Sequence, residues 1–193
     1  VGKHLNATLS DAQKNDLDKV FEVLLANNLA QPQVYVHRDY HSRNLMLTPT
    51  GELGIIDFQD AVTGPVTYDL ASLLRDAYVA WPDADVYRWV EQFREMLVEA
   101  GTLADDVSAE TFRAWFDLMA AQRHLKVVGI FARLSLRDGK HGYLNDIPLV
   151  LRYLLDEIAG LADLQPLHQL LVSLLPVYVA KFPAARDRLE PWL

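Results

Sequence analysis

The sequence contains no cysteine, and this absence excludes disulfide bonds and thiolate metal sites. It fits a reducing compartment, so we expect a cytoplasmic protein. Long apolar runs are also missing. The best candidate, residues 170–179, is broken by Pro176 and falls short of the roughly 18–20 residues that a membrane span needs. We therefore expect no membrane partner and no membrane-spanning segment.

Positive charge is scarce, because 18 Lys and Arg stand against 26 Asp and Glu and give a net charge of −8. Nucleic acids and anionic membranes are bound by surfaces with a surplus of Lys and Arg. We therefore expect no nucleic-acid partner. With 193 residues, 51% of them hydrophobic, the chain is long enough for one globular domain with a good-sized core.

The nine glycines form no G-x-G-x-x-G pattern. Gly139-Lys140 lacks both the earlier Gly and the following Ser or Thr of a phosphate-binding P-loop. The sequence therefore predicts no phosphate-covering loop of its own.

The stretch from Val36 to Asp60 gathers the residues that indicate chemistry, and it reads V-H-R-D-Y-H-S-R-N-L-M-L-T-P-T-G-E-L-G-I-I-D-F-Q-D. Apolar runs at 45–47 and 54–56, joined by residues 48–52, predict a β hairpin that sets residue 44 beside residue 57. Asn44 and Asp57 would then offer two hard oxygen ligands beside the Asp39 carboxylate. Such a set suits Mg²⁺ and the phosphates of ATP.

This pattern, H-x-D-x-x-x-x-N followed by D-F, resembles the catalytic loop and metal-binding Asp of the kinase-like fold. It is most similar to the aminoglycoside phosphotransferase family of small-molecule kinases. Residues 37–46, 56–73 and 122–148 look like the anomeric sugar kinases of bacterial cell-wall recycling, which phosphorylate N-acetylmuramate and N-acetylglucosamine. The resemblance implies an ATP-dependent sugar kinase in which Asp39 orients the acceptor hydroxyl and Asn44 and Asp57 bind Mg²⁺.

Two further residues, His37 and Asp69, are expected to support the loop, and the neighbouring Arg38 is expected only to pair locally. His37 ends a short buried strand and is interpreted as a structural imidazole. Asp69 begins a helix and is interpreted as its cap, and the resemblance implies that it also accepts hydrogen bonds from backbone amides of the catalytic loop. Arg38 stands where small-molecule kinases of this family usually have Gly, and we expect it to pair with a nearby carboxylate.

A second group of residues is predicted to bind the acceptor. His41 and Arg43 lie inside the loop and could face either phosphate or the acceptor, and Asp60 follows Asp57 by three residues. Residues 123–141 carry five Lys or Arg against one acid in an otherwise acidic chain. If Arg123 and Lys126 face the cleft beside Asp39, they would favour a sugar with a carboxylate or acetamido group.

The rest of the chain is predicted to be helical, over about 11–28, 70–79, 83–100, 108–137, 146–161 and 166–181, with one short strand at 34–36. The fold class is therefore mostly α with a small β hairpin. The resemblance implies that residues 1–193 form a single domain, the C-terminal lobe of a kinase-like fold. The catalytic loop arrives by residue 37, so we expect the nucleotide-gripping N-terminal lobe to be absent and this chain to fold but be inactive alone.

Four alternatives remain open from the sequence. Two are other small-molecule kinases, acting on aminoglycosides at a 3'-type hydroxyl or on choline or homoserine. A polycationic aminoglycoside favours an acidic pocket and a quaternary ammonium favours an aromatic cage, and the basic 123–141 segment matches neither well. The others are a non-catalytic kinase-like module and a metal hydrolase, which would need more His or carboxylate ligands.

The segment after Asp57 is short, with only about ten residues before the next helix. This is too few for the phosphorylated activation segment with which a protein kinase docks a peptide, so a small-molecule acceptor is favoured.

Overall fold

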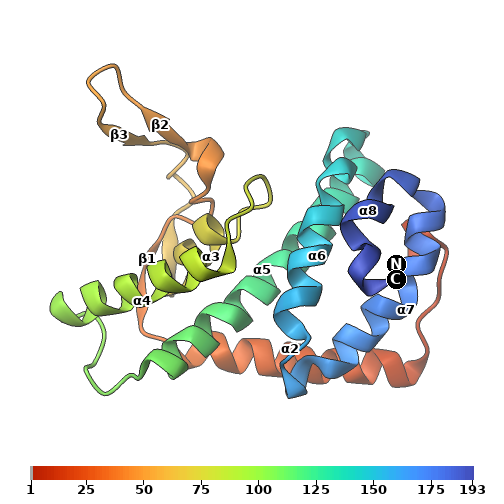
Figure 1. Ribbon diagram of the computed structural model, residues 1–193, viewed down its shortest axis with the longest axis horizontal. Helices are drawn as coiled ribbons and strands as arrows, with labels where there is room; N and C mark the ends of the chain where they lie inside the picture. The colour runs from red at the N-terminus through yellow and green to blue at the C-terminus, as the bar shows by residue number, and fades with distance from the viewer. Residues whose placement is uncertain (1) are drawn as a thin grey trace. The chain divides into compact units, whose positions relative to one another are not determined.

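The computed structural model describes residues 2–193 (Figure 1). Its helices are α1 (Gly2–Leu5), α2 (Asp11–Ala30), α3 (Tyr68–Leu74), α4 (Asp83–Glu99), α5 (Ala109–Asp138), α6 (Ile147–Ile158), α7 (Gln165–Lys181) and α8 (Arg186–Leu189). Its strands are β1 (Gln33–Val36), β2 (Leu45–Leu47), β3 (Leu53–Ile55) and β4 (Val62–Pro65). The predicted class, mostly α with a small hairpin, is confirmed. The chain divides into two compact units, Ala26–Arg123 and the residues on either side of it.

Two helix starts follow the local rules that predict them. Before α2, the Ser10 N–H donates to Gln13 Oε1 at 2.9 Å and the Gln13 N–H donates to Ser10 Oγ at 3.2 Å. This reciprocal pair is a capping box, and it satisfies two amides that the first turn leaves unpaired. Before α5, Ser108 Oγ accepts from the Thr111 N–H at 3.2 Å. Both helices therefore begin where the sequence predicts.

Helix α3 is shorter than predicted, because it ends at Leu74 rather than near residue 79. The buried Asp76 accepts a hydrogen bond from the Tyr78 N–H at 3.0 Å, which fixes a turn in place of a further helical turn. Arg75, also buried, donates to Asp83 at 2.8 Å at the start of α4. The predicted extension to residue 79 was wrong because these two polar side chains hold the chain outside the helix.

The unit Ala26–Arg123 has its core between α3, α4 and α5, where buried apolar side chains form one cluster: Val66, Ala71, Leu74, Val86, Val90, Leu103, Phe112, Phe116, Met119 and Ala120. Beside it, β1 pairs antiparallel with β4. The strand β4 was not predicted, because its four residues, V-T-G-P, include Gly and Pro, which are uncommon inside strands.

Gly64 permits the close approach of β4 to β1. A Cβ atom at this position would lie 2.7 Å from Cγ2 of Val36, which is buried and β-branched and therefore has little freedom to move. We predict that Gly64→Ala lowers the free energy of unfolding by about 1–3 kcal/mol. The measurement is thermal or urea unfolding of the chain, in which this loss corresponds to a fall in Tm of roughly 2–10 °C.

Gly54→Ala on β3 is the matched control, because its added Cβ would meet no atom closer than 3.6 Å. We expect this control to change the free energy of unfolding by less than about 1 kcal/mol. Equal losses in the two variants would mean that the contact with Val36 is not what makes Gly64 necessary.

The β2–β3 hairpin has a register one residue away from the predicted one. Leu45 pairs with Ile55 and Leu47 with Leu53, so Asn44 lies opposite Ile56, whose N–H donates to the Asn44 carbonyl at 3.1 Å. The prediction that residue 44 lies beside residue 57 was therefore wrong. The cause is a tight loop over residues 49–51, closed by a Thr48–Glu52 hydrogen bond, with Gly51 in the left-handed region at φ 83°.

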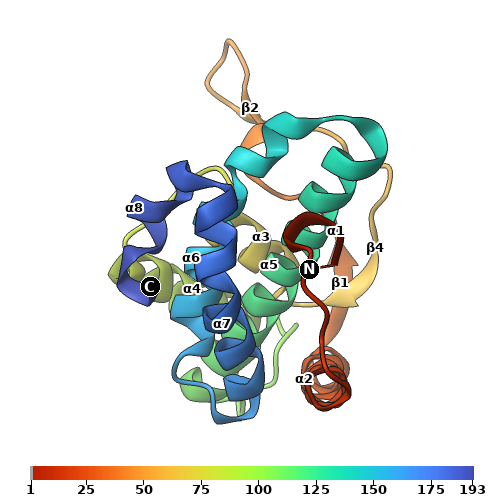
Figure 2. The same ribbon diagram turned by 90° about the vertical axis from the view of Figure 1, so that its right-hand side faces the viewer.

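In the other unit, α6 packs against α7 and α8, and Figure 2 shows these three helices side by side. Helix α6 buries eight of its residues, which is why its sequence is so apolar. A buried polar contact joins α5 to α6, with His124 Nδ1 3.0 Å from Glu157 Oε2. The His124 ring also stacks on Tyr153, with ring centroids 5.5 Å apart. This unit is therefore held by an apolar core that also contains buried polar contacts.

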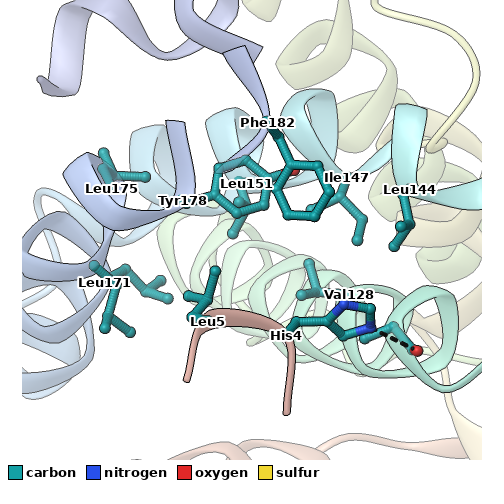
Figure 3. A pocket seen from close by; sticks show the side chains of 12 residues that line it. His4, Leu5, Val128, Leu144, Ile147, Leu151, Leu171, Leu175, Tyr178 and Phe182 are labelled. Atoms are coloured by element: carbon teal, nitrogen blue, oxygen red, sulfur yellow. Dashed lines mark hydrogen bonds between the residues drawn. The ribbon is translucent and has the colours of Figure 1, made fainter. Parts of the chain in front are cut away.

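An apolar pocket lies in the same unit, between α1, α5, α6 and α7, and Figure 3 shows its side chains. His4 holds α1 there through a 3.0 Å contact of its ring Nε2 with the Ala132 carbonyl. Burial raises the pKa of Tyr178, on the opposite wall, to about 12. None of the twelve side chains that line this pocket belongs to the predicted site. Among residues 2–193, no helix combines the length and the apolar character needed to cross a bilayer.

Candidate active site

The loop that follows β1 is attached to α3 through Asp69. Asp69 Oδ2 accepts the His37 N–H at 2.6 Å, and Oδ1 accepts the Arg38 N–H at 3.0 Å. The residue at the N-cap position of α3 is Thr67, not Asp69. Asp69 instead accepts hydrogen bonds from the two loop amides, as the resemblance implied. The His37 ring adds a second attachment, because its Nε2 lies 3.0 Å from the Ile56 carbonyl. The loop is therefore tied to both α3 and the segment after β3.

Arg38 adopts a left-handed backbone conformation with φ 78°. For a residue with a Cβ atom this conformation is less favourable by about 1–2 kcal/mol, whereas for Gly it is almost neutral. This explains physically why Gly suits the position. The Arg38 side chain donates from Nη1 to the backbone carbonyl of Asp60 at 3.2 Å. The expectation that it pairs with a carboxylate was wrong, because the chain after Asp57 brings a carbonyl oxygen to the guanidinium instead.

The Asn44 side chain is hydrogen-bonded to the main-chain carbonyl of Asp39. Asn44 Nδ2 donates to the Asp39 carbonyl at 2.8 Å, and the His41 N–H donates to the same oxygen at 3.1 Å. Ser42–Asn44 form a short 3₁₀ turn that leads directly into β2. Within residues 2–193 the half-buried Asp39 carboxylate makes no hydrogen bond or ion pair, so both of its oxygens can accept from an incoming group.

Asp57 follows the hairpin one residue beyond the Asn44–Ile56 pair. In a regular strand, adjacent residues face opposite sides, so this register alone would separate the two side chains. The strand ends at Ile55, however, and Asp57 has φ 65°, which breaks the alternation. Its exposed carboxylate accepts from Gln59 Nε2 at 2.7 Å through Oδ1. The second carboxylate oxygen therefore remains available as a ligand.

The donor set fits a magnesium ion shared with a nucleotide. The side-chain nitrogen of Asn44 is hydrogen-bonded, so its side-chain oxygen Oδ1 would be the ligand atom, and Asp57 would offer a carboxylate oxygen. Mg²⁺ in such sites uses one or two protein oxygens and takes the remainder from phosphates and water. Across the described residues 2–193, no group of three or more His, Asp or Glu side chains could hold a metal ion.

His41 and Arg43, both predicted to bind the acceptor, meet at the ring of Tyr78. The Arg43 guanidinium carbon lies 3.4 Å from the Tyr78 ring centroid, and the His41 ring contacts the same ring edge-to-face at 5.8 Å. Arg43 is exposed. The loop therefore presents one cation supported by an aromatic ring, close in sequence to Asp39. Acceptor binding by His41 and Arg43 stays a prediction.

Asp76 is a residue that the sequence analysis missed. It is buried and accepts from both the N–H and the hydroxyl of Ser42, at 3.0 and 2.5 Å, while its other oxygen holds Tyr78. One carboxylate thus binds the first residue of the 3₁₀ turn that contains Asn44 and also the backbone of Tyr78, whose ring contacts Arg43. A single Asp just after an apolar helix does not by itself indicate a role in a site. Its partner Ser42 lies 34 residues away in the sequence, so no local pattern connects them.

Arg123 is not placed as the prediction required. It is 9% exposed, and its guanidinium donates to the Arg38 carbonyl at 3.2 Å and to Ser72 Oγ at 2.5 Å. Its donors thus support the loop and do not line an open surface. Lys126, three residues later, is exposed and belongs to the other unit. Asp60 is exposed and contributes its carbonyl oxygen to Arg38. Acceptor binding by Lys126 and by the Asp60 carboxylate stays a prediction.

Comparison with known proteins identifies a family and several relatives of this chain. Residues 3–107 match the model of the phosphotransferase enzyme family, a range that includes Asp39, Asn44, Asp57 and Asp69. Over 174 residues, or 90% of the chain, the sequence is 45% identical to the N-acetylmuramate/N-acetylglucosamine kinase of Pseudomonas putida and 47% identical to that of Neisseria meningitidis. A kinase of the same name from Caulobacter vibrioides is 34% identical over 143 residues, which is 71% of the chain and 37% of that protein.

The chain spans about half the length of the curated relatives it matches, 51% of the Pseudomonas putida kinase and 52% of the Neisseria meningitidis kinase.

Proposed function

Because the chain belongs to the phosphotransferase enzyme family, we propose that it forms the catalytic lobe of an ATP- and Mg²⁺-dependent kinase that phosphorylates a hydroxyl of a small sugar. The observation that supports this most directly is the loop geometry. Asp39 and Asn44 are linked by a 2.8 Å hydrogen bond, and Asp57 stands next to the residue paired with Asn44. A catalytic carboxylate beside two oxygen ligands is the arrangement that phosphoryl transfer needs.

In this proposal Asp39 acts on the acceptor. Its carboxylate accepts a hydrogen bond from the acceptor hydroxyl and aligns that oxygen with the γ-phosphorus. As the new oxygen–phosphorus bond forms, the bond between the γ-phosphorus and the bridging oxygen of ADP breaks, and the hydroxyl proton passes to Asp39. Asn44 and Asp57 would hold Mg²⁺, which when bound neutralises charge on the β- and γ-phosphates. Asp69 keeps the loop in position throughout.

The nucleotide needs contacts beyond these residues. The sequence has no Gly-rich loop that could cover the phosphates, and the chain spans about half of its relatives' length. We propose that residues 1–193 are the C-terminal lobe and that an N-terminal lobe, with such a loop and a lysine for the α- and β-phosphates, completes the enzyme. On this proposal the isolated chain folds but does not turn over, and the enzyme acts in the cytoplasm, where ATP is available.

The proposed acceptor is N-acetylmuramate or N-acetylglucosamine, phosphorylated at the anomeric hydroxyl as a step of cell-wall recycling. The supporting observation is that relatives named for these two sugars are 42–47% identical to this chain over 90% of its length. N-acetylmuramate carries a carboxylate, and Arg43 is an exposed cation in the catalytic loop. We infer that Arg43, rather than Arg123, is the cation that would favour an acidic acceptor.

The test compares three acceptors on the full-length protein with Mg·ATP: N-acetylmuramate, N-acetylglucosamine and kanamycin. We predict that kcat/KM for the two sugars exceeds that for kanamycin by at least about 100-fold, or roughly 2.7 kcal/mol of transition-state binding. The product should lose its phosphate in mild acid, as an anomeric phosphate does. A preference for kanamycin, or an acid-stable phosphate on the sugar, would favour the aminoglycoside kinase instead.

A further inference from the structure

The backbone of Arg38 is held on both sides of its α-carbon. Asp69 accepts the N–H groups of His37 and Arg38, and Arg123 Nη1 donates to the Arg38 carbonyl at 3.2 Å. These three hydrogen bonds surround a residue with φ 78°, a conformation that surrounding contacts must maintain. Arg38 immediately precedes Asp39, so its backbone sets the direction in which the Asp39 side chain leaves the loop.

Arg123 is itself rigidly held. Its Nη2 donates to Ser72 Oγ at 2.5 Å, and its guanidinium carbon lies 4.6 Å from the ring centroid of Tyr68. Tyr68, Asp69 and Ser72 all belong to α3. Helix α3 therefore contributes Asp69, which binds the loop amides. It also contributes Ser72 and Tyr68, which hold the Arg123 guanidinium where it binds the loop carbonyl.

Burial of the Arg123 guanidinium removes water from a charged group, which is energetically unfavourable. Burial lowers the pKa of Arg123, while the neighbouring Tyr68, Asp39 and Asp69 favour its charged form. An apolar residue could fill the same volume without that cost. What only Arg provides is a planar group with several fixed N–H donors, which can reach Ser72 and the Arg38 carbonyl together.

We propose that Arg123 is a positioning residue for phosphoryl transfer: by holding the Arg38 carbonyl it fixes the orientation of the Asp39 carboxylate, and it does not contact the acceptor. This inference rests on the proposed function of Asp39. It replaces the sequence-based expectation that Arg123 binds the sugar.

The kinetic test uses Arg123→Met and Arg123→Lys in the full-length protein. A small misplacement of a catalytic group costs about 100-fold in rate, so we expect Arg123→Met to lower kcat by about that factor. Arg123→Lys keeps the charge but has one ammonium group in place of the fork, and we expect a kcat loss of about tenfold. The KM values for ATP and for the sugar should stay within about threefold in both variants.

Arg113→Met is the matched control, because Arg113 is on the same helix, is more than half exposed and pairs with Asp117. We expect its kcat to equal that of the parent. Three results would overturn the proposal: a raised KM for the sugar at unchanged kcat, an unchanged kcat in Arg123→Met, or the same loss in Arg113→Met. The first of these would restore Arg123 as an acceptor-binding residue.

A second readout does not depend on activity. In the chain of residues 1–193, amide hydrogen exchange at His37 and Arg38 should become at least about tenfold faster in Arg123→Met, while amides of α6 and α7 keep their rates. Exchange that is unchanged at these two amides, or faster throughout the chain, would also overturn the proposal. If the parent enzyme phosphorylates none of the sugars, the proposed function fails while this measurement still reports whether Arg123 holds the loop.

Discussion

Asp39→Asn in the full-length protein is expected to lower kcat by at least about 1,000-fold while the Kd for Mg·ATP stays within a few fold. The carboxamide keeps the shape of the side chain, but it cannot take the proton of the acceptor hydroxyl. The substitution removes the negative charge that favours the charged form of Arg123, but within residues 2–193 it breaks no hydrogen bond of the Asp39 side chain, so we expect the chain to fold. Steady-state kinetics and nucleotide titration measure the two quantities separately.

Asp57→Ala is expected to weaken nucleotide binding as well, because Asp57 is proposed to bind the metal. Its Mg²⁺-dependent affinity for ATP should fall strongly, together with turnover. Glu52→Gln, at the exposed tip of the same hairpin, is the control and should leave both quantities unchanged. A comparable loss of nucleotide affinity in the Asp39 and Asp57 variants would contradict the separate roles proposed for them.

Asp69→Ala is the second substitution with a large expected effect, because it leaves two loop amides without their acceptor. Each hydrogen bond to a charged group contributes about 1.5–3 kcal/mol, so we expect the free energy of unfolding to fall by roughly 3 kcal/mol or more. The loop then loses the backbone geometry that directs Asp39, and kcat should fall by about 100-fold or more. Urea unfolding and steady-state kinetics test the two effects.

Asp85→Ala is the control for Asp69→Ala. It tests whether the loss of stability comes from the hydrogen bonds of Asp69 to the loop or only from removing a negative charge at the start of a helix. Both Asp69 and Asp85 lie in the first turn of a helix, but Asp85 is paired with Arg88 at the surface. An acid near a helix N-terminus contributes about 0.3–1 kcal/mol through the helix dipole alone. If the two substitutions destabilised the protein equally, the hydrogen bonds of Asp69 to the loop would not explain its importance.

Local spacing made much of the fold predictable. The apolar residues of α2, α4, α5 and α7 recur every three or four positions, and Ser10 and Ser108 start their helices through contacts three residues away. The predicted helices are found within a few residues, apart from the end of α3. These features follow from the sequence because the interactions that decide them lie within one or two turns.

The hairpin shows the limit of this reasoning. Its existence followed from two apolar runs around Thr48 and Gly51, but its register depended on the conformation of Gly51. The tight loop over residues 49–51 moves every pair one residue away from the predicted register and places Asn44 opposite Ile56. The apolar runs alone do not fix this register, and the backbone geometry of the loop decides it.

The sequence by itself determined which residue types the proposed site uses, since Asp39, Asn44 and Asp57 lie within one short stretch around a hairpin. Only the tertiary structure decided how that stretch is held. Asp69, Asp76 and Arg123 lie 31, 34 and 85 residues from the loop residues they bind. Such contacts exist only after α3 and α5 have packed against the loop, and no periodicity in the sequence records them. The same packing buries Arg123, which was predicted from the sequence to bind the sugar, against Ser72 of α3 and the carbonyl of Arg38 in the loop.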